Sequence, residues 1–230
     1  MPAVWGQDTL SPPPSLRVEA DSSRPARSAW RLQDARISLD IVPPLKRWLS
    51  PDIRQTEAGL ELLFENGWLA IVEGGGGRIE RKGSDFNYES RGIFLRAGLD
   101  FNLWQANKSG AGGLWTLGFK YGWAGFEQSL DYSLPPGYWS SETGRIENKG
   151  LQAHWLVLQS RLQAQLFRGF FLGPLVRLHL LIQAPELAET ELNSIPGFGL
   201  RRGGRIEIGY QLVYRFWQKS GKNKNQKQEP

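Results

Sequence analysis

The feature that most constrains the fold of this chain is an alternation of apolar and polar side chains near its end. Residues 206–217 read IEIGYQLVYRFW, with a large apolar side chain at every second position and mostly polar, small or charged ones between. Because successive side chains of a strand point to opposite faces, the segment predicts a β-strand with one apolar and one polar face. The same alternation of apolar and polar residues recurs at about residues 36–42, 57–65, 68–73, 92–103, 115–123, 151–166 and 172–183.

The polar face of these eight segments distinguishes a membrane barrel from a soluble one. It is rich in glycine, which costs stability on a solvated strand but fits a narrow eight-stranded lumen, where small residues must alternate with long ones. It also carries charges of both signs in near balance, as a filled polar interior requires, because an unpaired buried charge is very unfavourable. The charged residues on this face are Arg36, Asp40, Glu61, Glu73, Arg96, Asp100, Lys120, Arg161, Arg177, Glu207 and Arg215.

We therefore predict an all-β chain that forms an eight-stranded up-and-down transmembrane β-barrel. Its apolar face would contact lipid, and the listed charges would form a network in the lumen. The alternative is a soluble, lipocalin-like barrel, which also has eight alternating strands but hides its apolar face inside.

Composition excludes several other classes of protein. The chain of 230 residues has no run of about 18 to 20 apolar residues, so no transmembrane helix is expected. It has no cysteine, which excludes disulfides, thiolate metal sites and a cysteine nucleophile. The net charge of +5 is spread along the chain, so we predict no nucleic-acid partner.

The connections between the predicted strands alternate in length. The turns at residues 66–67 and 167–169 are short, and the connection at 105–112 is intermediate. Outer-membrane barrels have short periplasmic turns and longer extracellular loops, so this alternation predicts a bacterial outer-membrane location with both termini in the periplasm. The long connections are expected at residues 43–56, 74–87, 127–150 and 184–204, with the glycine run 74–77 as a flexible loop entry.

The two ends of the chain differ in character from the strands. Residues 1–34, rich in Ser, Pro and Arg, are predicted to be a disordered periplasmic leader. Within it, residues 1–7 are either the remnant of a signal-peptide cleavage region or simply disordered. The barrel itself is predicted over residues 35–217. Residues 218–230 form a basic tail, expected to be disordered in the periplasm, with contact to periplasmic partners as the alternative.

The last predicted strand carries a possible sorting motif. Glu207, Gly209, Leu212 and Tyr214 fit the pattern polar-x-Gly-x-x-apolar-x-apolar, which resembles the carboxy-terminal β-signal read by the barrel assembly machinery. The usual signal ends the chain at an aromatic residue, whereas here residues 218–230 follow. The pattern is degenerate, so its position in the last strand is what makes the barrel assembly machinery an expected partner.

Several blocks of the predicted barrel resemble a known family. The chain is similar to an uncharacterised outer-membrane barrel family of the Bacteroidota, catalogued as a domain of unknown function. The resemblance covers residues 36–217 and implies the location and the fold, but it implies no activity. The blocks that carry it are residues 95–102, 118–122, 150–178 and 195–199.

The sequence offers little chemistry. Residues 74–77 lack the Lys-Ser/Thr of a phosphate-binding loop, and no helix is predicted after them. His154 and His179 lack the spacing of a zinc pair. Ser160 shares the lipid-side parity of His154 but lies about 20 Å along the same strand at about 3.3 Å per residue, which argues against a catalytic dyad. We predict no catalytic, cofactor-binding or metal-binding residues and no cofactor.

These observations favour a non-enzymatic barrel that is a structural or accessory subunit of a larger envelope assembly, such as insertion, secretion or transport machinery. The expected partners are outer-membrane lipid, the assembly machinery during insertion and other envelope proteins. Tyr138 and Trp139, on the longest predicted loop, are possible partner contacts. The alternative is a small outer-membrane enzyme acting on lipid A or peptides. A narrow pore is the weaker alternative, because eight strands enclose little more than side chains.

Overall fold

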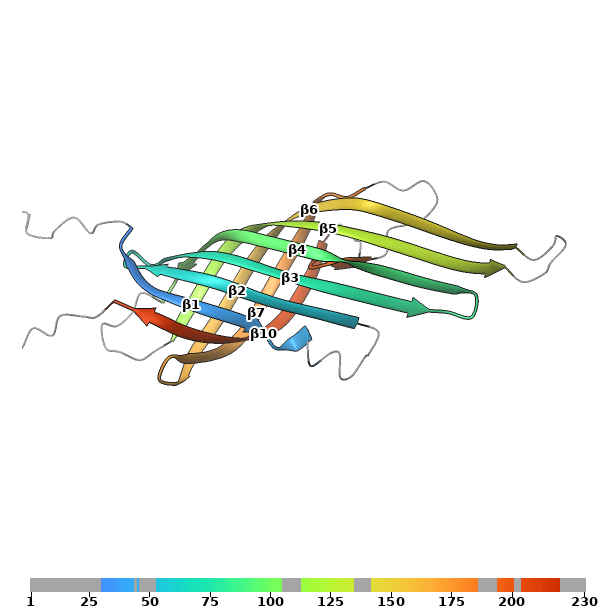
Figure 1. The fold of residues 1–230 in the computed structure, drawn as a ribbon. Coiled ribbons are helices and arrows are strands. Elements are labelled where there is room, and N and C mark those ends of the chain that lie inside the picture. The colour runs from blue at the N-terminus through green and yellow to red at the C-terminus, as the bar shows by residue number, and fades with distance from the viewer. Residues whose placement is uncertain are drawn as a thin grey trace, which may run out of the picture.

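A computed structural model of the chain describes residues 30–43, 45, 53–104, 113–134, 142–185, 194–200 and 204–219. Within these ranges, eight antiparallel strands close a barrel in the order β1-β10-β7-β6-β5-β4-β3-β2 (Figure 1). The predicted eight-stranded up-and-down barrel is confirmed. Its strands are β1 (Leu32–Asp40), β2 (Ile53–Phe64), β3 (Trp68–Lys82), β4 (Phe86–Asn102), β5 (Leu114–Leu134), β6 (Glu142–Phe167), β7 (Phe170–Gln183) and β10 (Gly204–Gln218).

The two faces of the barrel are inverted relative to a soluble protein. Ile206 and Ile208 on the outer face of β10 are each 69% exposed, and large apolar side chains continue around the outside on the other strands. Charged side chains such as Arg96 and Glu73 are fully buried inside. A closed barrel satisfies its backbone hydrogen bonds between strands, so such an apolar exterior belongs in lipid. The lipocalin-like alternative is wrong. No helix in the described ranges is long and apolar enough to cross a bilayer.

The glycine run at residues 74–77 is strand rather than loop, which corrects the expected loop entry. Gly74 to Gly77 lie within β3 and pair with β2 on one side and β4 on the other. A Cβ on Gly75 would lie 2.2 Å from the Thr56 carbonyl oxygen and 2.6 Å from the Phe94 ring. Glycine is therefore required where the Phe94 ring crosses the backbone of β3.

Most of residues 127–150, predicted as a loop, are also strand. β5 runs to Leu134 and β6 begins at Glu142, with pairs from Gln128↔Asn148 to Leu134↔Glu142. Together with the ends of β3 and β4, they extend well past the shorter strands (Figure 1). We call residues 78–82, 86–91, 127–134 and 142–150 the distal sheet. Tyr138 and Trp139 lie outside the described residues.

A short hairpin packs inside the barrel beside the distal sheet. β8 (Ser194–Ile195) and β9 (Gly199–Leu200) pair with each other, and we call residues 194–200 the plug hairpin. Phe198 is fully buried, with its ring centroid 5.9 Å from that of Trp155. The Ser90 hydroxyl donates a hydrogen bond of 3.1 Å to the Ser194 carbonyl. Residues 194–200, part of the connection predicted as a long loop between β7 and β10, thus pack into the barrel.

The described ends of the chain lie together at the end opposite the distal sheet, which we call the terminal end (Figure 1). β1 begins at Leu32 and β10 ends at Gln218, within a few residues of the predicted limits of the barrel. Lys219 Nζ donates a hydrogen bond of 2.7 Å to Glu65 Oε1 in the β2–β3 turn. This bond lowers the pKa of the Glu65 carboxyl. The leader up to residue 29 and the tail from residue 220 lie outside the described residues.

The closed barrel predicts a simple biochemical signature. Because every strand is paired on both sides, detergent alone should not unfold the protein, whereas boiling should. We expect the protein to fractionate with membranes, and unheated and boiled samples to migrate differently in SDS gels. Recovery of the protein in the soluble fraction without detergent would contradict the lipid-facing assignment.

Candidate functional site

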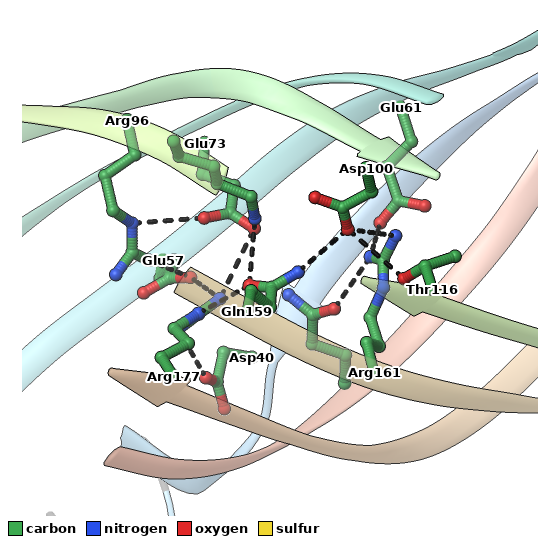
Figure 2. A network of polar contacts seen from close by, with 12 residues as sticks. Asp40, Glu57, Glu61, Glu73, Arg96, Asp100, Thr116, Gln159, Arg161 and Arg177 are labelled. Carbon is green, nitrogen blue, oxygen red and sulfur yellow. Dashed lines mark hydrogen bonds and ion pairs between the residues drawn. The ribbon is translucent and has the colours of Figure 1, made fainter. Parts of the chain in front are cut away.

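The lumen contains a network of buried ion pairs centred on Glu73 of β3. One oxygen of this carboxylate, Oε1, lies 2.5 Å from Lys120 Nζ and 3.3 Å from Arg177 Nη2. The other, Oε2, lies 3.1 Å from Arg96 Nε. All four side chains are fully buried, and the cations come from three other strands, Lys120 from β5, Arg96 from β4 and Arg177 from β7. Figure 2 shows Arg96 and Arg177 pointing toward Glu73.

A second carboxylate, Glu57 of β2, joins two of the same cations. Its Oε1 accepts a hydrogen bond of 2.7 Å from Arg177 Nη2 and forms a close ion pair with Arg96. Arg177 Nη1 also lies 3.5 Å from Asp40 Oδ2 and 3.7 Å from Glu207 Oε1. Together with Glu73, these residues place four carboxylates from four strands around the Arg177 guanidinium.

Gln159 of β6 connects this cluster to the next one along the barrel axis. Its Oε1 accepts hydrogen bonds of 2.9 Å from Lys120 Nζ and from Arg177 Nε. Its Nε2 donates a hydrogen bond of 3.2 Å to Asp100 Oδ2. Asp100 belongs to a second cluster in which Arg161 pairs closely with Glu61 (Figure 2). The amide thus bridges two clusters that each contain both cations and carboxylates.

A third cluster lies toward the terminal end. Arg36 binds the Asp34 carboxylate through two hydrogen bonds, of 2.8 and 2.7 Å, and donates a third of 3.0 Å to Gln163 Oε1. The guanidinium groups of Arg36 and Arg215 lie over the Phe171 ring, 4.8 and 5.2 Å from its centroid. Bidentate pairing and ring stacking are favourable ways to bury arginine.

The structure places the residues of the predicted lumen network as follows. All are at most 3% exposed except Glu207 and Arg215, whose side chains are 13% and 20% exposed. Asp34 and Glu57 belong to the same network but were not predicted as members. Asp34 precedes the predicted start of the first strand, and Glu57 stands at the first residue of the second. Asp34 lies two residues before Arg36, and Glu57 lies four residues before Glu61, so both fall at inward-facing positions of their strands. This alternation is the sequence signal that could have identified them.

The network cross-links the barrel and leaves little scope for chemistry. Every strand of the barrel contributes a polar side chain, so breaking one pair leaves charges buried in several strands. Among the described residues, no group of three or more His, Asp or Glu side chains could hold a metal ion. Cations and carboxylates that already bind one another are poorly placed to exchange protons with a substrate.

The two histidines and Ser160 lie apart. His179 faces the lumen with its Nε2 3.0 Å from Glu207 Oε2, and its ring contacts Phe198 of the plug hairpin. His154 faces outward, with its Nδ1 2.7 Å from the Tyr121 hydroxyl. Ser160 accepts a hydrogen bond of 3.3 Å from the Trp115 indole. No His–Ser dyad is formed by these residues.

The outer face of the distal sheet carries paired surface charges around a cavity of about 230 Å³. Arg78 pairs with Glu89 at 2.8 Å, Arg91 pairs closely with Glu127, and Glu147 pairs with Arg145 at 2.7 Å and Lys149 at 3.1 Å. The hydrogen bond from Lys149 and the charges of Lys149 and Arg145 lower the pKa of the Glu147 carboxyl. Exposed pairs of this kind contribute little to stability.

The residues of the predicted sorting motif all lie in β10, which joins β1 and β7 to close the barrel. Glu207 and Gly209 face the lumen, and Tyr214 is exposed on the outside. A Cβ on Gly209 would lie 2.8 Å from Asp40 Oδ2 and 2.9 Å from Leu175 Cδ1. The glycine of the motif is therefore also needed for packing inside the barrel.

Comparison with known proteins identifies the family of the chain but no activity. No curated protein matches the chain. A similar solved structure is the crystal structure of Ail, the attachment invasion locus protein of Yersinia pestis, with 11% identity and a TM-score of 0.40, covering 81% of this chain and 100% of that chain. A model of a domain of unknown function, DUF6048, matches residues 13–216. Because this match spans most of the sequence, the chain belongs to the DUF6048 family.

Proposed function

We propose that the protein is a non-enzymatic outer-membrane barrel that anchors a contact surface, the distal sheet, for other proteins of the cell envelope. It would act as a structural or accessory subunit of a larger assembly for insertion, secretion or transport. The observation that carries this proposal is the contrast between a lumen filled with ion pairs and a sheet of four strands that projects past the barrel. A rigid barrel with a protruding sheet suits anchoring and contact.

The filled lumen argues against the narrow pore. Arg177, Arg96 and Lys120 span the barrel interior in one cluster, and each is fully buried. The plug hairpin lies beyond them, with Ile195 and Phe198 packed into the distal end of the lumen. Ions would have to displace both layers to pass.

The positions of the histidines argue against the enzyme alternative. His179 is buried behind the plug hairpin, and His154 lies on the outer face of β6 beside Tyr121. A hydrolase or acyltransferase would need a histidine close to a nucleophile. Ser160, on the same face as His154, bonds to Trp115 instead.

The proposal includes an orientation and a route of insertion. Short connections at the terminal end and the long hairpins of the distal sheet favour periplasmic termini, with the distal sheet outside the cell. Glu207, Gly209, Leu212 and Tyr214 would present the last strand to the barrel assembly machinery. An origin in the Bacteroidota remains a prediction from the family resemblance.

The contact role can be tested by shortening the distal sheet in register. Asp131 and Arg145 are paired across β5 and β6, so residues 132–144 can be replaced by Asn-Gly, which favours a two-residue hairpin turn. We expect this variant to fold normally but to lose the proteins that co-purify with the full chain from native membranes in mild detergent. Mass spectrometry of the purified material would measure the loss.

The matched variant His154→Gln, His179→Gln separates the enzyme from the anchor. It removes both histidines of the chain and leaves the tip of the distal sheet intact. We expect it to keep its partners and its cellular function in a complementation assay. If the histidine variant folds but fails to complement, while the shortened hairpin complements fully, the anchor proposal is wrong and an enzyme is favoured.

A further inference from the structure

The outer surface of β4 and β5 changes abruptly in character where the distal sheet begins. On β4 the outward residues change from Ile93 to Arg91, and on β5 they change from Trp123 through Gly125 to Glu127. Ile93 is 61% exposed, as expected of a lipid-facing side chain. This level is therefore the edge of the apolar band, where tryptophan is commonly found in membrane barrels.

An open groove of about 570 Å³ lies across this edge. Its apolar walls include Ile93, Trp123 and Leu151, and Gly125 leaves its floor without a side chain. A Cβ on Gly125 would lie 3.1 Å from the Trp123 ring, so the indole lies against the bare backbone there. The outward-facing Ile93 and Trp123 place the groove on the lipid-facing side of the barrel.

Four cations stand directly beyond the groove, around the cavity of about 230 Å³. The side chains of Arg78, Arg91, Arg145 and Lys149 are 46–70% exposed, whereas those of their partners are 25–45% exposed; the partners are Glu80, Glu89, Glu127, Asp131 and Glu147. The cations are thus the more accessible members of these pairs. Arg91 and Glu127 line both the cavity and the groove, so the two features form one amphipathic site.

We infer that this site binds a phosphorylated lipid, with an acyl chain in the groove and a phosphate on Arg91 and its neighbouring cations. Guanidinium groups bind phosphate through paired hydrogen bonds, and such charge-assisted bonds are strong. A lipid is the kind of molecule that crosses the edge of the apolar band with a charged head beyond it. In the orientation proposed above, on which this step rests, the facing leaflet is the outer one, so the lipid is the diphosphorylated glycolipid lipid A.

Native mass spectrometry of the full chain in detergent, with added diphosphoryl lipid A, tests this site. We expect one lipid A molecule to remain bound to the wild type. The variant Arg91→Gln, Lys149→Gln should bind it at least about tenfold more weakly, because it loses charge-assisted hydrogen bonds. Gln152→Trp, which places a large ring in the groove from the exposed side of β6, should weaken binding without removing a charge.

Lys219→Gln is the matched control, since Lys219 is also exposed and paired with one glutamate but lies at the terminal end. It should bind lipid A like the wild type. Equal lipid A binding by wild type and Arg91→Gln, Lys149→Gln would overturn the site, as would equally tight binding of phosphatidylglycerol. Failure here is distinguishable from failure of the anchor proposal, because partner retention is tested at the hairpin tip, in residues 132–144.

Discussion

Arg177→Glu is expected to abolish most folding of the barrel. Its Nη2 lies 2.7 Å from Glu57 Oε1 and 3.3 Å from Glu73 Oε1, so the variant would bury a new carboxylate among existing ones. Removing one partner of a buried pair typically costs about 3–5 kcal/mol, and reversing its charge adds repulsion. That loss is comparable to a typical total stability of about 5–15 kcal/mol. The folded fraction, measured as heat-modifiable protein after refolding into detergent, should fall at least tenfold.

Arg78→Glu is the matched control for this charge reversal. Arg78 also pairs with a glutamate on a neighbouring strand, Glu89 at 2.8 Å, but its side chain is 46% exposed. Water can solvate both carboxylates in that variant, so its folded fraction should stay close to that of the wild type. Equal folded fractions for Arg177→Glu and Arg78→Glu would show that the lumen network does not stabilise the barrel.

The sequence was sufficient to predict the barrel because the faces of a strand follow from a period of two. Once Ile206, Ile208 and Tyr210 were assigned to lipid, Glu207 and Gly209 had to face inward, and the same reasoning held on the other strands. The same alternation placed charged residues such as Arg177 and Glu73 on the inner face of the barrel. It could not predict which of them form ion pairs, because the pairing depends on the stagger of the strands around the barrel.

The distal features escaped prediction for two physical reasons. Glycines 74–77 have no side chains to form a pattern. The charged residues of 127–150 lack an apolar face, since beyond the apolar band a strand no longer meets lipid. Their pairing is stabilised by neighbouring strands rather than by their own pattern. The strands of the plug hairpin are too short to show an alternation of apolar and polar residues. The burial of Ile195 and Phe198 depends instead on their contact with residues of other strands, such as Trp155.

Gly98→Val is expected to be as damaging to folding as the charge reversal, for a steric reason. Gly98 lies in β4 opposite Lys120 of β5. A Cβ there would lie 2.1 Å from the Phe119 carbonyl oxygen and 2.6 Å from the Lys120 Cα. Overpacking of a core typically costs about 1–3 kcal/mol, and more where backbone must move, because no rotamer change relieves the contact. The heat-modifiable fraction should fall at least tenfold.

Gly76→Ala is the comparison for Gly98→Val. It separates the steric effect of the close contact at Gly98 from the general effect of replacing a glycine in a strand. Gly76 is also in a paired strand, but a Cβ there would meet only the Gly92 carbonyl oxygen at 3.5 Å and Ile93 Cγ2 at 3.9 Å, which are ordinary contacts. Alanine at this position should leave folding unchanged or improve it slightly, because glycine loses more conformational freedom on folding. If Gly98→Val folded as well as Gly76→Ala, β4 and β5 would have to lie farther apart at Gly98 and Lys120 than in the structure. The strand pairing would then no longer fix the position of Lys120 beside Glu73.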